Sequence, residues 1–169
     1  RGGARAAGGG GSGGWSADAA SPGDWGGLSV GAGGSIELEH AAVRWAQFGV
    51  GAFSGSGLGG FVVRDSVVAH SQYQGLYVNA SRESAPAAAM VIDVSDNTVD
   101  GAAHDGIAIR SEGAAAAVPT VANNTVNHAG SDSGFFRWPA IAVDSPQLDP
   151  SRLTGNGGSD NAVGEMGLS

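Results

Sequence analysis

A six-residue phrase recurs five times along this chain, and a short apolar patch follows each copy. Each copy begins and ends with Val or Leu, and the copies span residues 38–43, 63–68, 94–99, 121–126 and 148–153. The patches that follow are Val50/Ala52, Leu76/Val78, Ile107/Ile109, Ile141/Val143 and Met166/Leu168. Successive copies start 25, 31, 27 and 27 residues apart. Self-similarity at a period of this length predicts a solenoid of stacked coils.

The repeats favour strands over helices. Apolar, largely β-branched residues alternate with polar ones, and Gly, Asn, Ser and Thr interrupt every window long enough for a helix. We therefore predict an all-β fold, a right-handed parallel β-helix of about six coils over residues 15–169. The count includes an early coil indicated by Leu28 and Val30. Residues 1–14 form a separate Gly-rich, low-complexity segment. Neither end of the solenoid shows a cap, so we expect a longer chain with flanking domains.

The fourth position of each phrase predicts a structural ladder. The first and sixth residues are expected to point into the solenoid on either side of a bend, which places the fourth residue at the bend. Side chains there on neighbouring coils lie ~4.8 Å apart, so their polar groups can bond one another and the turn backbone. The predicted ladder residues are Ser66, Asn97, Asn124 and Ser151.

Composition excludes several partners. The chain has 16 acidic and 8 basic residues, a net charge of −8, and the scattered arginines form no basic patch for a phosphate backbone. We therefore expect no nucleic-acid binding. No apolar run approaches the ~20 residues that span a bilayer, so we expect no membrane insertion. With no cysteine, thiol chemistry and disulfides are excluded.

Two stretches near the start carry a family resemblance. Residues 21–28 (SPGDWGGL) followed by 36–46 (IELEHAAVRWA) resemble bacterial secreted right-handed parallel β-helix repeat proteins, in which a PGDWGGI phrase precedes a coil of this type. Residues 148–169 are similar to another recurrent phrase of that group, so the resemblance covers 21–169. It implies a pectate-lyase-like solenoid in an exported or cell-surface protein. Most of the group has no assigned activity, so the resemblance implies no reaction.

The third position of the phrases gives a first pair of candidate catalytic residues. Asp65 and Asp96 would lie one coil apart, close enough for their carboxylates to repel or to hold a cation between them. The alternative is that both are solvated turn residues beside the ladder. We favour the alternative.

A second catalytic candidate is the phrase at residues 104–111 (HDGIAIRS). It resembles the DDCIAIKS phrase of polygalacturonase-type glycosidases, with His104 at the first carboxylate position and Arg110 at the basic one. Such enzymes need paired carboxylates, and the family's other motifs are absent here. Asp105 and His104 therefore belong only to an alternative hypothesis. Arg110 has a simpler expected partner in Asp144, at the equivalent position one coil on.

The histidines do not predict a metal site. His70 and His128 share a coil position but would lie two coils apart, too far to bind one transition-metal ion. We expect no resident metal or other cofactor. Calcium stays a hypothesis, because an acidic chain holding an acidic polymer would need a bridging cation.

The longest insertion within a coil, residues 127–139, is unusually aromatic. It carries Phe135, Phe136, Arg137 and Trp138, which suit stacking on sugar rings and pairing with uronate carboxylates. The alternative is that Phe135 and Trp138 fold back over the solenoid. We predict these four residues as a carbohydrate-binding surface, extended by Tyr73 and Tyr77. Trp25, Trp45 and Phe48 are expected to pack the N-terminal coils.

These observations lead to one functional hypothesis and its alternative. The leading hypothesis is a secreted or cell-surface solenoid that contacts extracellular polysaccharide or spaces other domains, without catalysis. The alternative is a glycoside hydrolase, lyase or epimerase acting on an acidic glycan, with Asp65, Asp96, His104 and Asp105 as catalytic candidates. A third class, an adhesin or assembly module, would pair its coil ends between chains.

Overall fold

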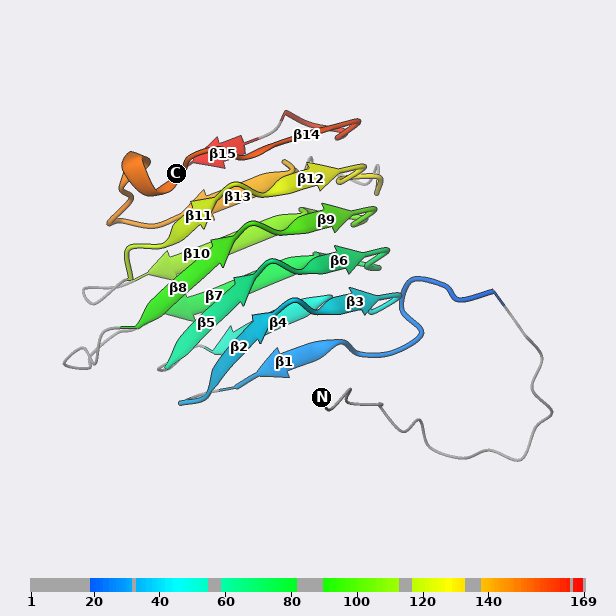
Figure 1. Ribbon diagram of the computed structural model, residues 1–169, viewed down its shortest axis with the longest axis horizontal. Helices are drawn as coiled ribbons and strands as arrows, with labels where there is room; N and C mark the ends of the chain where they lie inside the picture. The colour runs from blue at the N-terminus through cyan, green and yellow to red at the C-terminus, as the bar shows by residue number, and fades with distance from the viewer. Residues whose placement is uncertain are drawn as a thin grey trace.

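The computed structural model describes residues 19–31, 33–54, 59–81, 90–112, 117–132, 138–164 and 166–168. Over these residues the fold is all-β apart from one short 3-10 helix, and the paired strands run parallel. The chain winds through three sheets in turn and stacks each winding on the last, which makes a parallel β-solenoid (Figure 1). The predicted fold class is confirmed. The Gly-rich segment 1–14 lies outside the described residues.

Each sheet collects the equivalent strand of every turn. The first sheet contains, in spatial order, β1 (Leu28–Val30), β4 (Val50–Ser54), β7 (Leu76–Ser81), β10 (Ile107–Glu112), β13 (Ile141–Asp144) and β15 (Met166–Leu168). The second contains β2 (Ser35–Glu39), β5 (Gly60–Arg64), β8 (Val91–Ser95) and β11 (Thr120–Ala122). The third contains β3 (Ala42–Arg44), β6 (Val67–Ala69), β9 (Thr98–Asp100), β12 (Thr125–Asn127) and β14 (Gly157–Ser159).

The number of complete turns is about four, fewer than the predicted six. Strands β1–β12 supply four turns with a strand in every sheet, whereas the next turn has β13 and β14 but no second-sheet strand. The helix η1 (Pro150–Arg152) takes that place. Pro150 has no backbone N–H to donate to a sheet, which favours a helical turn there. The sequence-based count included the partial turns.

The repeated apolar patches form the inner face of the first sheet. Val50 pairs with Leu76, Leu76 with Ile107, and Ile107 with Ile141, so each patch stacks on its equivalent in the next turn. These side chains are at most 2 % exposed. The first and sixth residues of the phrases are buried in the same core, including Val63, Val68, Val94, Val99, Val121 and Val126. The predicted inward positions are therefore confirmed.

The corner between the second and third sheets repeats one backbone conformation. The third phrase residue has a φ of 47° to 58° in four successive turns, at His40, Asp65, Asp96 and Asn123. This left-handed region is uncommon for most residues but several-fold enriched in Asn, Asp and His. The turn geometry explains why short polar residues recur at this position.

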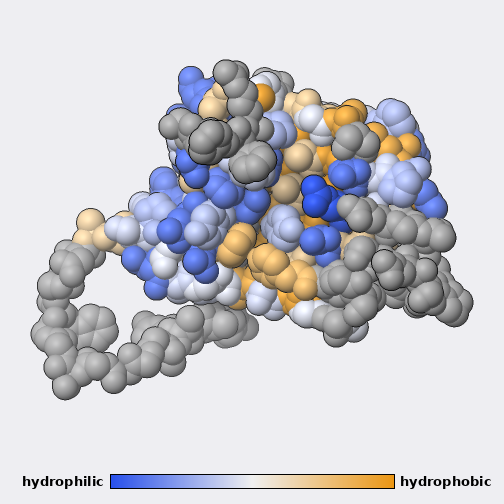
Figure 2. Space-filling view, turned by 180° about the vertical axis from the view of Figure 1, so that it is seen from behind, coloured by the Kyte–Doolittle hydropathy of each residue, from blue (hydrophilic) through white to orange (hydrophobic). Residues whose placement is uncertain are grey.

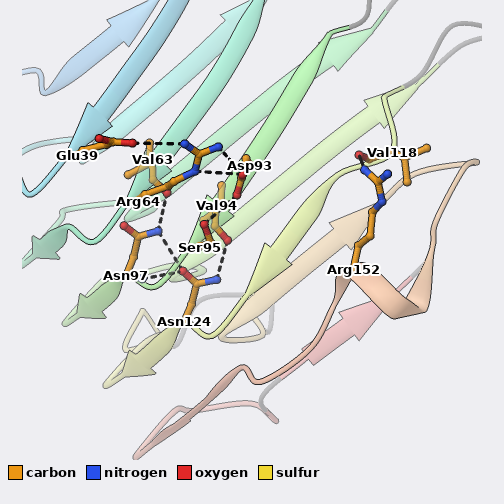
Figure 3. Close-up of polar contacts among 10 residues, drawn as sticks. All are labelled: Glu39, Val63, Arg64, Asp93, Val94, Ser95, Asn97, Val118, Asn124 and Arg152. Carbon is orange, nitrogen blue, oxygen red and sulfur yellow. Dashed lines mark hydrogen bonds and ion pairs between the residues drawn. The ribbon is translucent and has the colours of Figure 1, made fainter.

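The next residue in the corner forms the predicted ladder (Figure 3). The Asn97 side-chain nitrogen donates to Val63 O at 2.8 Å and to Asn124 Oδ1 at 3.0 Å. Asn124 repeats the pattern one turn on, donating to Val94 O at 2.9 Å. The backbone N–H of Ser66 donates to Asn97 Oδ1 at 3.0 Å. Ser66, Asn97 and Asn124 are all at most 3 % exposed, so the ladder satisfies buried backbone groups.

The ladder continues at Asn156, and its prediction at Ser151 is wrong. Asn156 Oδ1 accepts from the Asn124 side chain at 2.9 Å, and its own amide donates to Val121 O at 2.8 Å. Ser151 lies in η1 and donates to Asp149 instead. With Asn156 at the fourth position, the fifth copy of the phrase spans residues 153–158, and its sixth position is Gly158. A Cβ there would collide with the backbone oxygen of Val126, so no Val or Leu marks the repeat. The apolar pattern therefore pointed to residues 148–153 instead.

Candidate aromatic groove

The outer face of the first sheet is lined by small residues around one tyrosine. Tyr77 pairs with Gly51 on one side and Ala108 on the other, and Ala108 pairs with Ala142. Neighbouring residues such as Leu76 and Val78 are buried, so alternation along the strands turns this row outward. Small side chains beside Tyr77 leave room for a hollow. Figure 2, the view from behind, shows hydrophobic surface beside hydrophilic side chains.

Two adjoining hollows lie on this face. One, of about 340 Å³, is lined by Phe48, Phe53, Tyr73, Gln74, Tyr77, His104 and Trp138. The other, of about 440 Å³, is lined by Gln74, Tyr77, Asp105, Ala108, Ile109, Arg110, Trp138, Pro139, Ala142 and Asp144. Gln74, Tyr77 and Trp138 line both. We call the combined surface the aromatic groove.

Four aromatic rings of the groove contact one another across two neighbouring turns. Phe53 lies 5.1 Å from Tyr77 and 5.0 Å from Phe48, measured between ring centroids. Phe48 lies 5.0 Å from Tyr73. These distances suit offset and edge-on aromatic pairs. The result is a continuous aromatic wall, although the rings come from positions far apart in the sequence.

His104 joins this wall to Trp138. Its ring lies 5.1 Å from Tyr73 and stacks on Trp138 at 4.5 Å with an interplanar angle of 11°. Its Nε2 also lies 3.3 Å from Asp132 Oδ2. The stacking and this hydrogen-bond contact fix the imidazole ring, so His104 supports the placement of Trp138 in the groove.

Asp105 is a buried carboxyl that still borders the second hollow. It is 3 % exposed. Burial raises the pKa of Asp105 to about 6, while a hydrogen bond donated by the Gln74 side chain and the nearby His104 act in the opposite direction. Desolvation disfavours the charged carboxylate, which is the physical cause of the shift. The groove thus holds one acidic group that exchanges its proton near neutral pH.

Arg110 and Asp144 border the same hollow as an ion pair. They occupy paired positions on β10 and β13, and Arg110 Nε lies 3.6 Å from Asp144 Oδ2. Both side chains are substantially exposed. The pairing predicted from coil position is confirmed. Such an exposed pair contributes about 0–1 kcal/mol to stability.

The structure brings several of the predicted site residues together. Tyr73, Tyr77 and Trp138, three of the six residues predicted to bind carbohydrate, line the groove. His104 and Asp105, from the catalytic alternative, border it as well. The remaining predicted binding residues, Phe135, Phe136 and Arg137, lie outside the described residues.

The other two catalytic candidates lie at a different corner. Asp65 and Asp96 are exposed residues of the left-handed corner between the second and third sheets. Asp96 Oδ1 accepts a hydrogen bond of 3.1 Å from the Asn123 side chain. His104 and Asp105 lie instead in the connection from the third sheet to the first. The placement agrees with Asp65 and Asp96 being turn residues beside the ladder.

The sequence did not predict several groove residues, among them Phe48, Phe53 and Gln74. Phe48 was expected to pack the N-terminal coils, yet it lines the groove. Phe53 follows the buried Ala52, so strand alternation alone could have placed it on the outer face, where it is 47 % exposed. Gln74 carries no sequence signal, because its position depends on how the connection before β7 folds.

The described ranges show neither a metal centre nor a membrane helix. Within them, no group of three or more His, Cys, Asp and Glu side chains is placed to hold a metal ion. His70 stacks on Trp45 at 4.1 Å, and His128 Nδ1 lies 2.7 Å from Asp100 Oδ1. Those same residues include no helix long and apolar enough to cross a bilayer.

Comparison with known proteins gives no match for this chain among family models, curated proteins or solved structures. The resemblance to secreted β-helix repeat proteins therefore stays a prediction. The groove is therefore the feature from which a function can be inferred.

Proposed function

We propose that this chain is a binding solenoid that holds an extracellular polysaccharide in the aromatic groove without cleaving it. The observation that carries the proposal is the aromatic wall, which begins at Phe53 and is joined to Trp138 through His104 across stacked turns. It lies beside polar side chains that include Gln74 and Asp105.

A polysaccharide suits this combination of surfaces. Each sugar ring has an apolar C–H face, which packs on an aromatic face, and a rim of hydroxyls that need hydrogen-bond partners. Large aromatic side chains that form one contiguous exposed patch commonly mark a binding site. A groove formed by several turns also suits a polymer, because successive sugars can contact successive turns.

The setting of the binding solenoid follows the family resemblance. We propose a bacterial, exported or cell-surface protein in which the solenoid is joined to flanking domains. A calcium ion bridging the protein to an acidic polymer is the alternative to this direct binding. Chelation would test it, since binding through such a bridge is lost on chelation and direct binding is not.

The test is affinity electrophoresis of the whole chain through gels that contain single neutral or acidic polysaccharides, with and without chelator. We expect retardation by at least one polysaccharide. Trp138→Ala should weaken it about tenfold, because the variant removes an aromatic face shared by both hollows. The control is Val91→Ala, an exposed hydrophobic residue of the second sheet. Retardation unchanged in Trp138→Ala, or absent from every gel, would refute the proposal.

One observation favours the catalytic alternative. Asp105 and Asp144 border the same hollow, and the pKa of Asp105 is raised to about 6. A carboxyl with a raised pKa beside a second carboxylate is the minimum for general acid and base chemistry on a glycosidic bond. This alternative enzyme would be a glycoside hydrolase, lyase or epimerase.

The length of the polymer after incubation distinguishes the binding solenoid from a hydrolase or lyase. A binding solenoid leaves the polymer length unchanged in size-exclusion chromatography. A hydrolase or lyase shortens it, and Asp105→Asn abolishes the shortening. An epimerase changes the sugar composition without shortening the polymer, which composition analysis after hydrolysis would detect.

A further inference from the structure

The charges of the described residues that border the aromatic groove disfavour an acidic polymer. The described Asp, Glu, Arg, Lys and His residues that line the second hollow are Asp105, Arg110 and Asp144, two acids and one base. Arg110 is already paired with Asp144 at 3.6 Å. Asp132 adds a further carboxylate against His104. A uronate entering the groove would meet like charges and would compete with Asp144 for Arg110.

The polar groups of the groove instead suit hydroxyls. Asp105 is 3 % exposed, and the Gln74 side chain donates a hydrogen bond to it, so its carboxyl is held in one orientation. A carboxylate accepts hydrogen bonds from hydroxyl groups, and an amide both donates and accepts. A buried, oriented polar group discriminates strongly between ligands that satisfy it and ligands that do not.

These groups lie beside the stacking surface. Gln74 lines both hollows, as do Tyr77 and Trp138, and Asp105 lines the second. The sheet between them presents Ala108 and Ala142, whose small side chains leave space for a ring. A sugar packed on Trp138 in this space would bring its hydroxyl rim toward Gln74 and Asp105.

We propose that the aromatic groove selects neutral, hydroxyl-rich glycans over uronate polymers, and that Gln74 and Asp105 set this preference. The inference rests on the proposed polysaccharide binding and adds the class of ligand and the residues that choose it. Asp105 acts as a fixed acceptor for sugar hydroxyls and as a negative charge that repels uronates.

The experiment compares polymers that differ only in charge. Polygalacturonate and alginate are each used native and after chemical reduction of their carboxyl groups to neutral hydroxymethyl groups. Binding to the whole chain is measured by affinity electrophoresis with chelator present, at low and high salt. Linkage and chain length are the same within each pair, so the affinity ratio reports the effect of the uronate charge.

We expect at least one reduced polymer to bind about fivefold or more tightly than its native form at low salt. Added salt should lower this affinity ratio, because it screens the repulsion between the groove carboxylates and the uronate groups. The affinity for the neutral polymer should change little. Asp105→Asn should also narrow the ratio and weaken binding of the neutral polymer. The matched control is Asp65→Asn, which removes one carboxylate at the distant corner, where Asn123 already holds the equivalent position.

Two results would overturn the inference, and they are distinguishable from failure of the proposed function. Native uronate polymers that bind as tightly as their reduced forms, or more tightly, would contradict the selection while leaving polysaccharide binding intact. If Asp105→Asn and Asp65→Asn change the affinity ratio between reduced and native polymers equally, the net charge of the protein sets the preference, and Asp105 has no specific role. Absence of binding to every polymer would refute the proposed function itself, and this inference with it.

Discussion

The side-chain nitrogen of Asn97 lies 3.0 Å from the side-chain oxygen of Asn124, a residue 27 positions away and one turn further along the solenoid. The same Asn124 oxygen accepts the backbone N–H of Asn97 at 3.1 Å. Each asparagine therefore bonds the turn before it and the turn after it. Adjacent turns are joined at this corner by side chains as well as by the parallel sheets.

Removing one member of the ladder should be costly. Asn124→Ala deletes the bonds to Asn97, Val94 O and Asn156, and leaves buried backbone groups unpaired. Each unsatisfied buried group costs about 1–3 kcal/mol, so we expect the free energy of unfolding to fall by about 3 kcal/mol or more. Urea denaturation measures it. Asp65→Asn, in the exposed position beside the ladder, should stay within about 0.5 kcal/mol, and an equal loss in both variants would contradict the prediction.

Two buried serines should respond in opposite ways to alanine. Ser71 is 2 % exposed, and its Oγ has no hydrogen-bond partner, whereas the equivalent positions Ala102 and Ala129 are alanines. Ser71→Ala should be neutral or stabilise the protein by about 1 kcal/mol, because it removes a buried hydroxyl that bonds nothing. Thermal unfolding would show this, and a lower Tm would count against it.

Ser66→Ala is the matched comparison for Ser71→Ala. Ser66 is 3 % exposed, and its Oγ donates to Arg64 O at 2.7 Å and accepts the Ala41 N–H at 3.1 Å. Its removal should cost about 1–3 kcal/mol. If the two variants unfold alike, hydrogen bonding does not distinguish these serines.

Asp105 should make stability depend on pH in the acid to neutral range. Its pKa is raised from 3.8 to about 6, so the folded protein holds this proton more tightly than the unfolded chain. The associated stability is fully present below pH 3.8 and is lost as pH rises through 6. One pKa unit corresponds to about 1.4 kcal/mol.

Asp105→Asn should remove this dependence. Compared with the native chain, we expect the variant to be more stable at pH 7, by on the order of 2 kcal/mol, and about equal near pH 4. Urea denaturation at several pH values measures the difference. A constant difference between the two proteins from pH 4 to pH 8 would show that Asp105 titrates alike when folded and unfolded.

Gly75 should tolerate no side chain. A Cβ there would collide with Val99 Cγ1 and lie 2.6 Å from Gly106 O in the next turn. Gly75→Ala is expected to destabilise the protein by about 1–3 kcal/mol, because the turns must separate to admit the methyl group. Gly26→Ala provides the control, since nothing lies within 4 Å of a Cβ at that position. Thermal unfolding should separate the two variants, and equal Tm values would contradict the prediction.

The repeat alone was enough to predict the solenoid, the inward positions and most of the ladder. A parallel coil fixes which residues stack, so equal spacing in sequence becomes neighbouring position in space. The pairings of Val50 with Leu76 and of Arg110 with Asp144 followed from this rule. The structure also places Tyr73 and Tyr77 on the same surface as Trp138.

Only the tertiary structure decided where the spacing changed. The ladder step from Asn124 to Asn156 is 32 residues, against 27 for the step before it, and η1 occupies part of the added length. The local pattern placed Ser151 in the ladder, because Leu148 and Leu153 have the spacing of the first and sixth residues of a phrase. The true phrase ends in Gly158 and not in Val or Leu, because the backbone of Val126 approaches too closely there for a side chain. The apolar residue that marks the end of the other phrases is therefore missing.

The groove likewise depended on the fold. The sequence determined that the chain must coil and that aromatic residues gather near one connection, since both follow from local order and period. The burial of Asp105, the arrival of Gln74 beside it and the alignment of Phe48 and Phe53 with Trp138 required the packed structure. Desolvation and ring contacts arise from residues of different turns, and no single stretch of the chain specifies them.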